Sequence, residues 1–421
     1  MSEDTYQSPF LREASARGFI YQGTHLDKLD ILLSTQKIAA YIGFDPTADS
    51  LHVGNLVQIM WLRMLQKHGH TPIILVGGGT GRVGDPSGKD AQRQMMTDDT
   101  IAHNIAGIKK TLEQFIDFSP HSINPAILVD NNAWLAPINY LDFLREYGTH
   151  FTINRMLTFD SVKTRLERET PLTFLEFNYM LLQGYDFEQL FLSHNCVLEL
   201  GGSDQWGNII CGVELIRRRQ NKQVFGLTSP LVTTSSGAKM GKSAHGAVWL
   251  THQKYAIFDF WQYWRNTDDA DVGRFLRMFT DLPLTEIENL EKYKDAEINQ
   301  AKIVLANAMT ALCHGELAAI EAQRAAESHY STAGQSVFRG LPVLRLDMTL
   351  VGEGISGTSL LVCLGLCASK GEARRLIAGG GVRINNIPLA DAEALLFQEE
   401  CPSEGWKISL GKKRHYHVVS A

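Results

Sequence analysis

Short apolar segments that alternate with helical patterns constrain the fold of this chain more than any other feature of its sequence. Four of them are suited to buried strands: Lys37–Phe44, Pro72–Val76, Ala126–Val129 and Val197–Leu200. Between the first two, Leu56 to Gln66 carries apolar residues at helical spacing. This alternation predicts an α/β fold in which helices cover both faces of a parallel sheet. Each strand ends in a glycine-rich or polar turn, so we expect these turns to converge on one cleft at the carboxyl ends of the strands.

Beyond about Ser243 the strand patterns give way to helices. Residues Tyr255 to Ala319 are predicted to be mainly helical, and they carry an aromatic cluster that we expect in the core. Around Thr332 to Glu353 the pattern weakens while Gly and Pro recur, which indicates a linker. The last part combines a helix, Lys370–Ala378, with strand-like segments at Val382–Ile384 and His415–Val418. The predicted domains are therefore 1–243, 244–331 and 354–421, with a linker over 332–353.

The composition is that of a globular protein. Of the 421 residues, 44% are hydrophobic and 20% are charged, which excludes global disorder. The first residues lack the pattern of a signal peptide, and no apolar run approaches the ~18 residues of a membrane span, so we expect a cytoplasmic protein. The net charge is −6, but from Ser356 onward eight Lys and Arg oppose six Asp and Glu, so the end of the chain is locally basic.

The cysteines do not indicate a disulfide framework or a metal site. Six of them are scattered along the chain, and no pair has the C-x-x-C spacing of zinc ligands. Cys363 and Cys367 lie four residues apart in an apolar stretch, where small buried thiols are common. We predict no protein-bound metal.

A glycine-dense turn follows the second predicted strand and raises the possibility of a dinucleotide-binding enzyme. Gly79 to Gly84 satisfies G-x-G-x-x-G. The acidic residue expected about 20 positions later would fall near Asp98, but Ala91 to Ala106 shows no strand that could present it. A phosphate loop is also excluded, because Val83 stands where its first glycine belongs and Asp90 follows Lys89.

Two other segments have the residue types that bind phosphates. His52-Val-Gly-Asn55 opens a predicted helix, where unpaired backbone N–H groups favour anions. Lys239-Met-Gly-Lys-Ser243 follows a flexible polar stretch. Taken singly, a histidine at a helix start is more often a cap, and a lysine pair is more often part of a solvated loop. Together they form the two-part nucleotide signature of class I aminoacyl-tRNA synthetases.

More closely, the sequence resembles the bacterial tyrosyl-tRNA synthetases over essentially its whole length. Asn55 stands where the general class I motif ends in histidine, and Gly241 replaces the usual central serine of the lysine loop. The resemblance rests on six blocks in the expected order: Tyr41-Ile-Gly-Phe-Asp-Pro-Thr47, His52-Val-Gly-Asn55, Gly84-Asp-Pro-Ser-Gly-Lys89, Tyr179-Met-Leu-Leu-Gln-Gly-Tyr-Asp186, Gly201-Gly-Ser-Asp-Gln-Trp-Gly-Asn208 and Lys239-Met-Gly-Lys-Ser243.

The resemblance implies a Rossmann-like catalytic domain, a helical domain on the anticodon side and a small α+β RNA-binding domain of a ribosomal-protein type. It implies that L-tyrosine and ATP, accompanied by Mg²⁺, give tyrosyl-adenylate and pyrophosphate, after which tyrosine passes to the 3′ end of tRNA(Tyr). It also implies a homodimer. Because the substrate carboxylate is itself the nucleophile, the protein must mainly align the reactants and neutralise charge.

The same resemblance assigns site residues by motif. Phenylalanine lacks the phenol hydroxyl, so it would leave a buried polar pair of the pocket without a partner. The pocket therefore disfavours phenylalanine, a discrimination for which this enzyme family is known. The expected tyrosine-binding residues are Tyr41, Asp85, Tyr179, Gln183, Asp186 and Gln205. The expected catalytic residues are His52, Asn55, Lys89, Arg93, Lys239 and Lys242. The expected ATP-binding residues are Gly43, Asp45, His52, Gly54, Asn55, Gly202, Asp204, Lys239, Met240, Lys242 and Ser243. The expected RNA-binding residues are Lys370, Arg374, Arg375 and Arg383.

Two other functions remain as alternatives. One is a nicotinamide-dependent oxidoreductase, suggested by the glycine pattern, and the other is a non-catalytic RNA-binding protein with a synthetase-like body. Gly202 and Asp204 could hold ribose hydroxyls, although an aspartate at this position is also a common helix N-cap.

Overall fold

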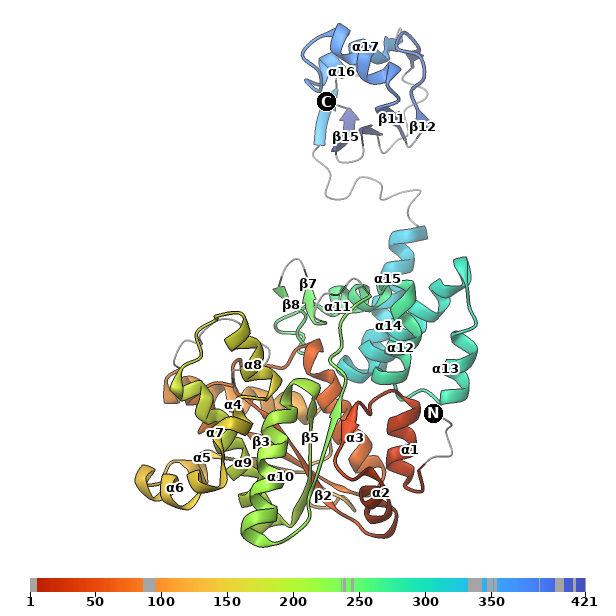
Figure 1. The fold of residues 1–421 in the computed structure, drawn as a ribbon. Coiled ribbons are helices and arrows are strands. Elements are labelled where there is room, and N and C mark those ends of the chain that lie inside the picture. The colour runs from red at the N-terminus through yellow and green to blue at the C-terminus, as the bar shows by residue number, and fades with distance from the viewer. Residues whose placement is uncertain are drawn as a thin grey trace. The chain divides into compact units, whose positions relative to one another are not determined.

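The structure is a computed structural model of the chain (Figure 1). It describes residues 6–85, 96–235, 237, 240–243, 246–331, 343–346, 351, 354–385, 387–397, 405–411 and 414–420. The chain divides into two compact units, Met1–Gln323 and Arg324–Ala421.

Residues up to 331 contain fifteen described α-helices and eight described strands. The helices are α1 (Pro9–Ala16), α2 (Leu26–Thr35), α3 (Leu56–Lys67), α4 (Asp98–Leu112), α5 (Asn132–Leu135), α6 (Tyr140–Glu146), α7 (Ile153–Met156), α8 (Asp160–Glu167), α9 (Phe174–His194), α10 (Trp206–Gln220), α11 (Ile257–Arg265), α12 (Asp269–Phe279), α13 (Leu284–Leu290), α14 (Ile298–His314) and α15 (Glu316–Ser331). The strands are β1 (Gln22–Gly23), β2 (Ala39–Phe44), β3 (Thr71–Val76), β4 (Ile127–Asp130), β5 (Cys196–Gly202), β6 (Phe225–Ser229), β7 (Lys242–Ser243) and β8 (Gly246–Ala247).

Six of these strands form one sheet in the order β1-β6-β5-β2-β3-β4. The neighbours from β6 to β4 are parallel, so the predicted α/β fold is confirmed. The edge strand β1 is antiparallel to β6, and neither strand was predicted. The sequence of β6, Phe-Gly-Leu-Thr-Ser, lacks an apolar run although all five residues are buried. Val197–Leu200, the last strand of this sheet expected from the sequence, is therefore followed by one more.

Helices cover both faces of this sheet. Tyr41, Ile73 and Cys196 lie on the face that packs against Phe187 of α9 and Ile216 of α10. Helix α3 connects β2 to β3, and Figure 1 shows it on the opposite side of the sheet from α9 and α10. This placement follows from right-handed crossovers that run in opposite directions from the centre of the sheet. The strand order reverses between β2 and β5, where α/β sheets bind ligands.

The helical segment predicted after Tyr255 is confirmed. Trp264 is fully buried and packs edge-on or tilted against Phe275 and Phe279 of α12, with ring centroids 6.1 and 5.7 Å away. Arg17, at the end of α1, donates hydrogen bonds to the carbonyls of Arg277, Thr280 and Leu282. These carbonyls lie at and just after the C-terminal end of α12, where a helix leaves acceptors unpaired. Arg277 donates in return to the carbonyl of Ala16, so two guanidinium groups join the N-terminal segment to the helical part.

The second unit is an α+β domain. Its sheet has the order β12-β11-β14-β15-β9, and its core includes Trp406, Ile408 and Val382. Its helices are α16 (Gly357–Cys363) and α17 (Lys370–Ala378), and its strands are β9 (Val343–Leu346), β10 (Ile355–Ser356), β11 (Val382–Ile384), β12 (Ile387–Pro388), β13 (Leu395–Leu396), β14 (Trp406–Leu410) and β15 (Arg414–Ser420). Strand β9 falls inside the segment expected as a linker and pairs in parallel with β15.

Among the described residues, no helix is both long and apolar enough to cross a membrane. In the same part of the chain, no group of three or more His, Cys, Asp and Glu side chains is arranged to hold a metal ion.

Candidate active site

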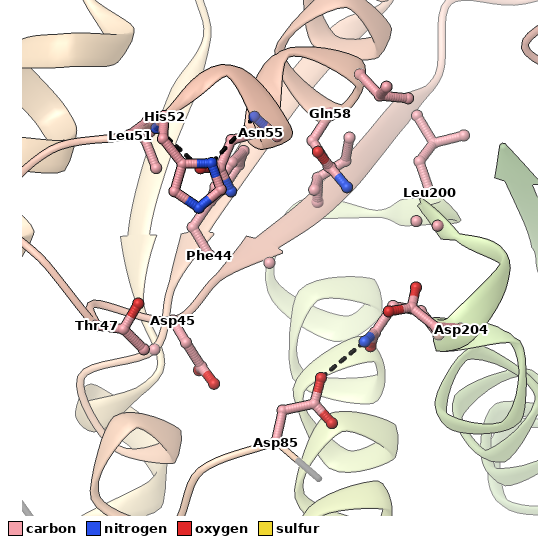
Figure 2. Close-up of a pocket in the computed structure, with 18 of the residues that line it drawn as sticks. Phe44, Asp45, Thr47, Leu51, His52, Asn55, Gln58, Asp85, Leu200 and Asp204 are labelled. Atoms are coloured by element: carbon pink, nitrogen blue, oxygen red, sulfur yellow. Dashed lines mark hydrogen bonds between the residues drawn. The ribbon is translucent and has the colours of Figure 1, made fainter. Parts of the chain in front are cut away.

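One cavity of about 690 Å³ opens at the carboxyl ends of the central strands. This volume is in the range of small-molecule sites. Figure 2 shows His52 and Asn55 on one side of the cavity, Asp85 and Asp204 on another, and Asp45 between them. These residues follow β2, β3 and β5, so the predicted convergence on one cleft is confirmed for these three turns. In the turn after β4, Asn131 bonds to Asp186 rather than lining the cavity itself.

A 3₁₀ turn, Val53–Asn55, carries the first phosphate-type segment into α3. The His52 backbone N–H donates to Asn55 Oδ1 over 3.1 Å, and the Gly54 N–H donates to His52 Nδ1 over 3.0 Å. The two side chains thus cap the turn that they flank, which fixes their positions at the cavity wall. His52 can cap the turn and also bind a ligand, because the cap uses its Nδ1 atom rather than Nε2.

The second phosphate-type segment reaches the same turn through its backbone. The N–H of Val248 donates to the carbonyl of Gly241, and the N–H of Val53 donates to the carbonyl of Val248, both over 2.9 Å. Gly241 has a φ of 85°, and a Cβ at this position would lie 2.6 Å from the Gly54 nitrogen. The glycine that departs from the family pattern therefore permits a close approach between the two segments.

The deeper part of the cavity is lined by aromatic and acidic side chains. Asp186 Oδ1 accepts a hydrogen bond of 2.7 Å from Trp134 Nε1, and Oδ2 accepts one of 2.9 Å from Asn131 Nδ2. Burial raises the pKa of Asp186 to about 7, although both donors favour its charged form. Burial, with the charges of Glu199 and Asp186, also raises the pKa of Tyr41 well above 10. A buried acid and a buried phenol thus face the same space.

Tyr179, one turn before Gln183 on α9, is held from the sheet side. Its hydroxyl donates to Asp45 Oδ1 over 3.1 Å, and Thr80 Oγ1 donates to the same oxygen over 3.2 Å. Asp45, expected from the resemblance at the ATP end, thus directly contacts an expected tyrosine-binding residue. The Asp45 carboxylate therefore lies where the expected ATP side and the expected tyrosine side of the cavity meet.

The turn after β5 contributes amide and carboxylate groups. Gln205 Nε2 donates to Asp85 Oδ2 over 2.7 Å, as the dashed line at Asp85 in Figure 2 shows. Gln205 is itself the N-cap of α10 and makes no side-chain cap. Asp204 is therefore not the N-cap residue of this helix, which weakens the simpler of its two interpretations.

Most of the residues that the sequence singled out line this cavity. They are Tyr41, Gly43, Asp45, His52, Gly54, Asn55, Asp85, Tyr179, Gln183, Asp186, Gly202, Asp204, Gln205 and Met240. Lys89, Arg93 and Lys239 lie outside the described residues. Lys242 and Ser243 form β7, but the structure describes only their backbone.

Sequence reasoning missed three side chains that complete the deep end: Asn131, Trp134 and Glu199. Glu199 is 2% exposed and also lines the cavity. Burial raises its pKa to about 8, although Gln183 and Tyr41 favour the charged form. An acidic residue inside an otherwise apolar strand was the one signal that could have drawn attention to it.

Comparison with known proteins agrees with this geometry. Residues 33–331 match the family described as tRNA synthetases class I (W and Y), and residues 359–395 match the S4 domain. The chain is 53% identical over 410 residues to a tyrosine–tRNA ligase of Gluconobacter oxydans, covering 97% of this chain and 98% of that protein. It is 51% identical over 417 residues to a tyrosine–tRNA ligase of Brucella abortus, covering 99% of each.

Among solved structures, a C-terminally truncated mitochondrial tyrosyl-tRNA synthetase of Aspergillus nidulans superposes with a TM-score of 0.68 at 30% identity, covering 78% of this chain and 95% of that one. The parallel sheet, with both phosphate-type segments at one cleft, defines a class I aminoacyl-tRNA synthetase. The chain belongs to the class I tRNA synthetases of the W and Y family.

Proposed function

We propose that the chain is a tyrosine–tRNA ligase that works in two steps at the described cavity. L-Tyrosine attacks the α-phosphate of ATP to give tyrosyl-adenylate and pyrophosphate, and the tyrosyl group then passes to the 3′-terminal adenosine of tRNA(Tyr). The observation that carries this proposal is the meeting of Gly54 and Gly241, because it brings both phosphate-type segments to one cleft.

The protein's part in the first step is to stabilise charge on the phosphates as the pyrophosphate leaves. His52 and Asn55 flank a helix start whose N–H groups favour anions. Lys242, at the start of the β7–β8 hairpin, and Lys239 of the same motif supply cations, and Lys89 and Arg93 act from the segment after Asp85. Mg²⁺ accompanies ATP and is bound by phosphate oxygens, the ligands that this cation prefers.

The nucleoside and amino acid bind on either side of Asp45. Gly43, Gly54 and Met240 line the ATP side and bind ATP together with Ser243, while Gly202 and Asp204 hold the ribose. Their position at the switch point of the sheet supports this arrangement.

The pocket for the amino acid takes the substrate phenol between Tyr41 and Asp186. Asp186 accepts two N–H hydrogen bonds and can accept a phenol O–H as a third partner. Asp85, Tyr179 and Gln183 hold the substrate ammonium group, and Gln205 lies near its carboxylate. A substrate without the hydroxyl would leave unfilled the hydrogen-bonding positions of Tyr41 and Asp186 that face it, so phenylalanine is rejected.

The second unit binds RNA through a basic strip. Lys370, Arg374 and Arg375 are exposed on α17, and Arg383 is exposed on the following strand β11. Such contacts to phosphates are tolerant of sequence and sensitive to salt. The match of residues 359–395 to the S4 domain supports this role.

The chain acts as a homodimer. Large apolar side chains on α6 to α9 and their connections are exposed. A partner protein usually covers a surface of this kind. The exposed side chains include Leu141 (68%), Ile153 (58%), Leu166 (52%) and Phe174 (69%). Phe174→Glu, at the first residue of α9 where a negative charge suits the helix, should shift the sedimenting species from dimer to monomer. An unchanged dimer would place the interface elsewhere.

The cytoplasmic location expected from the sequence stays a prediction.

Tyrosine-dependent exchange of labelled pyrophosphate into ATP tests the activity. The wild-type chain should support exchange with tyrosine and much more weakly with phenylalanine, and it should charge tRNA(Tyr). A chain that binds RNA but is inert in exchange would instead be a non-catalytic RNA-binding protein. Exchange of hydride with a nicotinamide cofactor would indicate an oxidoreductase.

A further inference from the structure

Five polar side chains form a continuous chain of hydrogen bonds beneath the amino acid pocket. Gln205 Nε2 donates to Asp85 over 2.7 Å, and Asn208 Nδ2 donates to Gln205 Oε1 over 3.3 Å and to Gln183 Oε1 over 2.9 Å. Gln183 Nε2 then donates to Glu199 Oε1 over 2.9 Å. Three members of this chain are expected to bind the substrate. The other two, Asn208 and Glu199, are 3% and 2% exposed, respectively.

The orientation of each amide in this chain follows from its ends. The Asp85 carboxylate only accepts hydrogen bonds, so the NH₂ group of Gln205 must face it. The oxygen of Gln205 therefore faces Asn208, whose NH₂ group serves both glutamine oxygens. This leaves the NH₂ group of Gln183 to face Glu199. Asn208 is the central donor, because reversing it would set oxygen against oxygen at two contacts.

The far end of the chain reaches the phenol side of the pocket. Tyr41 on β2 and Glu199 on β5 are paired residues of neighbouring parallel strands. The Tyr41 hydroxyl and Glu199 Oε2 are both buried without a partner of hydrogen-bonding geometry. Burial and the charge of Asp186 raise the pKa of Glu199 to about 8. The raised pKa favours the protonated form of Glu199, whose O–H can donate to the Tyr41 hydroxyl.

We propose that Asn208 and Glu199 are positioning residues for the amino acid substrate: Asn208 fixes both glutamine amides, and Glu199 acts as a neutral acid that donates to the Tyr41 hydroxyl. The Tyr41 O–H is then directed to the substrate phenol oxygen, and the substrate O–H to Asp186. This inference rests on the proposed function and deepens it. It assigns the direction of every hydrogen bond from Asp85 to the substrate phenol.

Exchanges at these two positions have distinct expected effects on the KM for tyrosine and the KM for ATP in the pyrophosphate exchange assay. Asn208→Asp removes the central donor, so the KM for tyrosine should rise about 10-fold while the KM for ATP changes less than about 2-fold. Glu199→Ala removes the donor to Tyr41 and should raise the KM for tyrosine about 3-fold, whereas Glu199→Gln keeps an acceptor oxygen and a donor N–H and should rescue most of this loss at pH 7.

Asn307→Asp is the matched control, because Asn307 accepts from Trp261 and donates to Gln323 in a polar network of the helical part. It should change the melting temperature without a selective effect on the KM for tyrosine. If Asn208→Asp does not fold, Asn208→Ser removes one donor without adding charge and should raise the KM for tyrosine about 3-fold.

An unchanged KM for tyrosine in the folded Asn208 variant would overturn the proposal. So would equal increases in both KM values, or a Glu199→Gln variant as impaired as Asn208→Asp. A wild-type chain without tyrosine-dependent exchange would instead overturn the proposed function, which makes the two failures distinguishable.

Discussion

Gly241 lies against Gly54 so closely that a Cβ on Gly241 would stand 2.6 Å from the Gly54 nitrogen. The two glycines come from segments that are 187 residues apart in the sequence. A carbonyl of one segment and an N–H of the other are joined through Val248, which bonds to both Gly241 and Val53. The end of the cavity that we propose for the phosphates is therefore built on backbone contacts, and the side chains are carried on that frame.

Gly241→Ala should lower kcat for pyrophosphate exchange. The substitution adds a Cβ at positive φ, which costs about 1–2 kcal/mol, and it pushes the hairpin away from the His52 turn. A kcat reduced about 5- to 30-fold is expected. Gly237→Ala is the control, because Gly237 also has a positive φ but faces open space. Equal effects of the two variants would show that the close approach is unimportant.

Asp186→Ala should raise the KM for tyrosine by about 10- to 100-fold, because a hydrogen bond to a charged group is removed from the pocket. The preference for tyrosine over phenylalanine should fall with it. Glu188→Gln on the same helix serves as the control, since Glu188 is buried but pairs with Arg219 rather than lining the cavity. Normal exchange kinetics in Asp186→Ala would exclude this carboxylate from substrate recognition.

Lys242→Ala should lower kcat by about 100-fold with little change in the KM for tyrosine, since its charge is required mainly as the pyrophosphate leaves. Steady-state and single-turnover exchange kinetics measure both quantities. Lys222→Ala, which removes an exposed lysine after α10, should leave both unchanged. An unaltered turnover number in Lys242→Ala would remove this lysine from the transition state.

Glu199→Gln should stabilise the protein increasingly as pH rises. The folded-state pKa of Glu199 is about 8 against 4.5 as the ordinary value, so between these pH values the folded state holds a proton that the unfolded state has released. The titration of Glu199 therefore lowers the free energy of unfolding of the wild type as pH rises between these two values. Glutamine does not titrate, so the variant lacks this decrease. The difference in melting temperature between variant and wild type should grow from pH 5 to pH 8. A constant difference would mean that Glu199 is not protonated.

Lys370→Ala combined with Arg375→Ala should raise the KM for tRNA and leave pyrophosphate exchange unchanged. The slope of log KM against log salt concentration should become shallower by about one for each RNA phosphate that the variant no longer neutralises. Arg374→Ala should have a smaller effect than either of these, because the Arg374 guanidinium already pairs with Glu393 at 2.5 Å. An unaltered salt slope in the double variant would place the RNA-binding surface on another face.

The regular elements could be predicted from local patterns. β11 and α17 have the predicted bounds, and α3 differs by one residue. The prediction failed at β6. All five of its residues are buried, but they do not form the apolar run that a strand buried on both faces usually shows. The prediction also failed to assign β9, four residues whose only strand partner among those described is β15, some seventy positions later.

The sequence by itself determined the alternation that makes an α/β sheet, and its motifs supplied most of the residues that line the cavity, because strand and helix periodicity and short motifs are local properties. Only the tertiary structure decided which acids are buried, so that their pKa is raised, and which amide faces which oxygen. Glu199 and Asp186 are both carboxylates, and what separates them is the number and kind of donors that distant segments bring to each. That environment is a property of the assembled sheet and helices, since no single segment of the chain contains it.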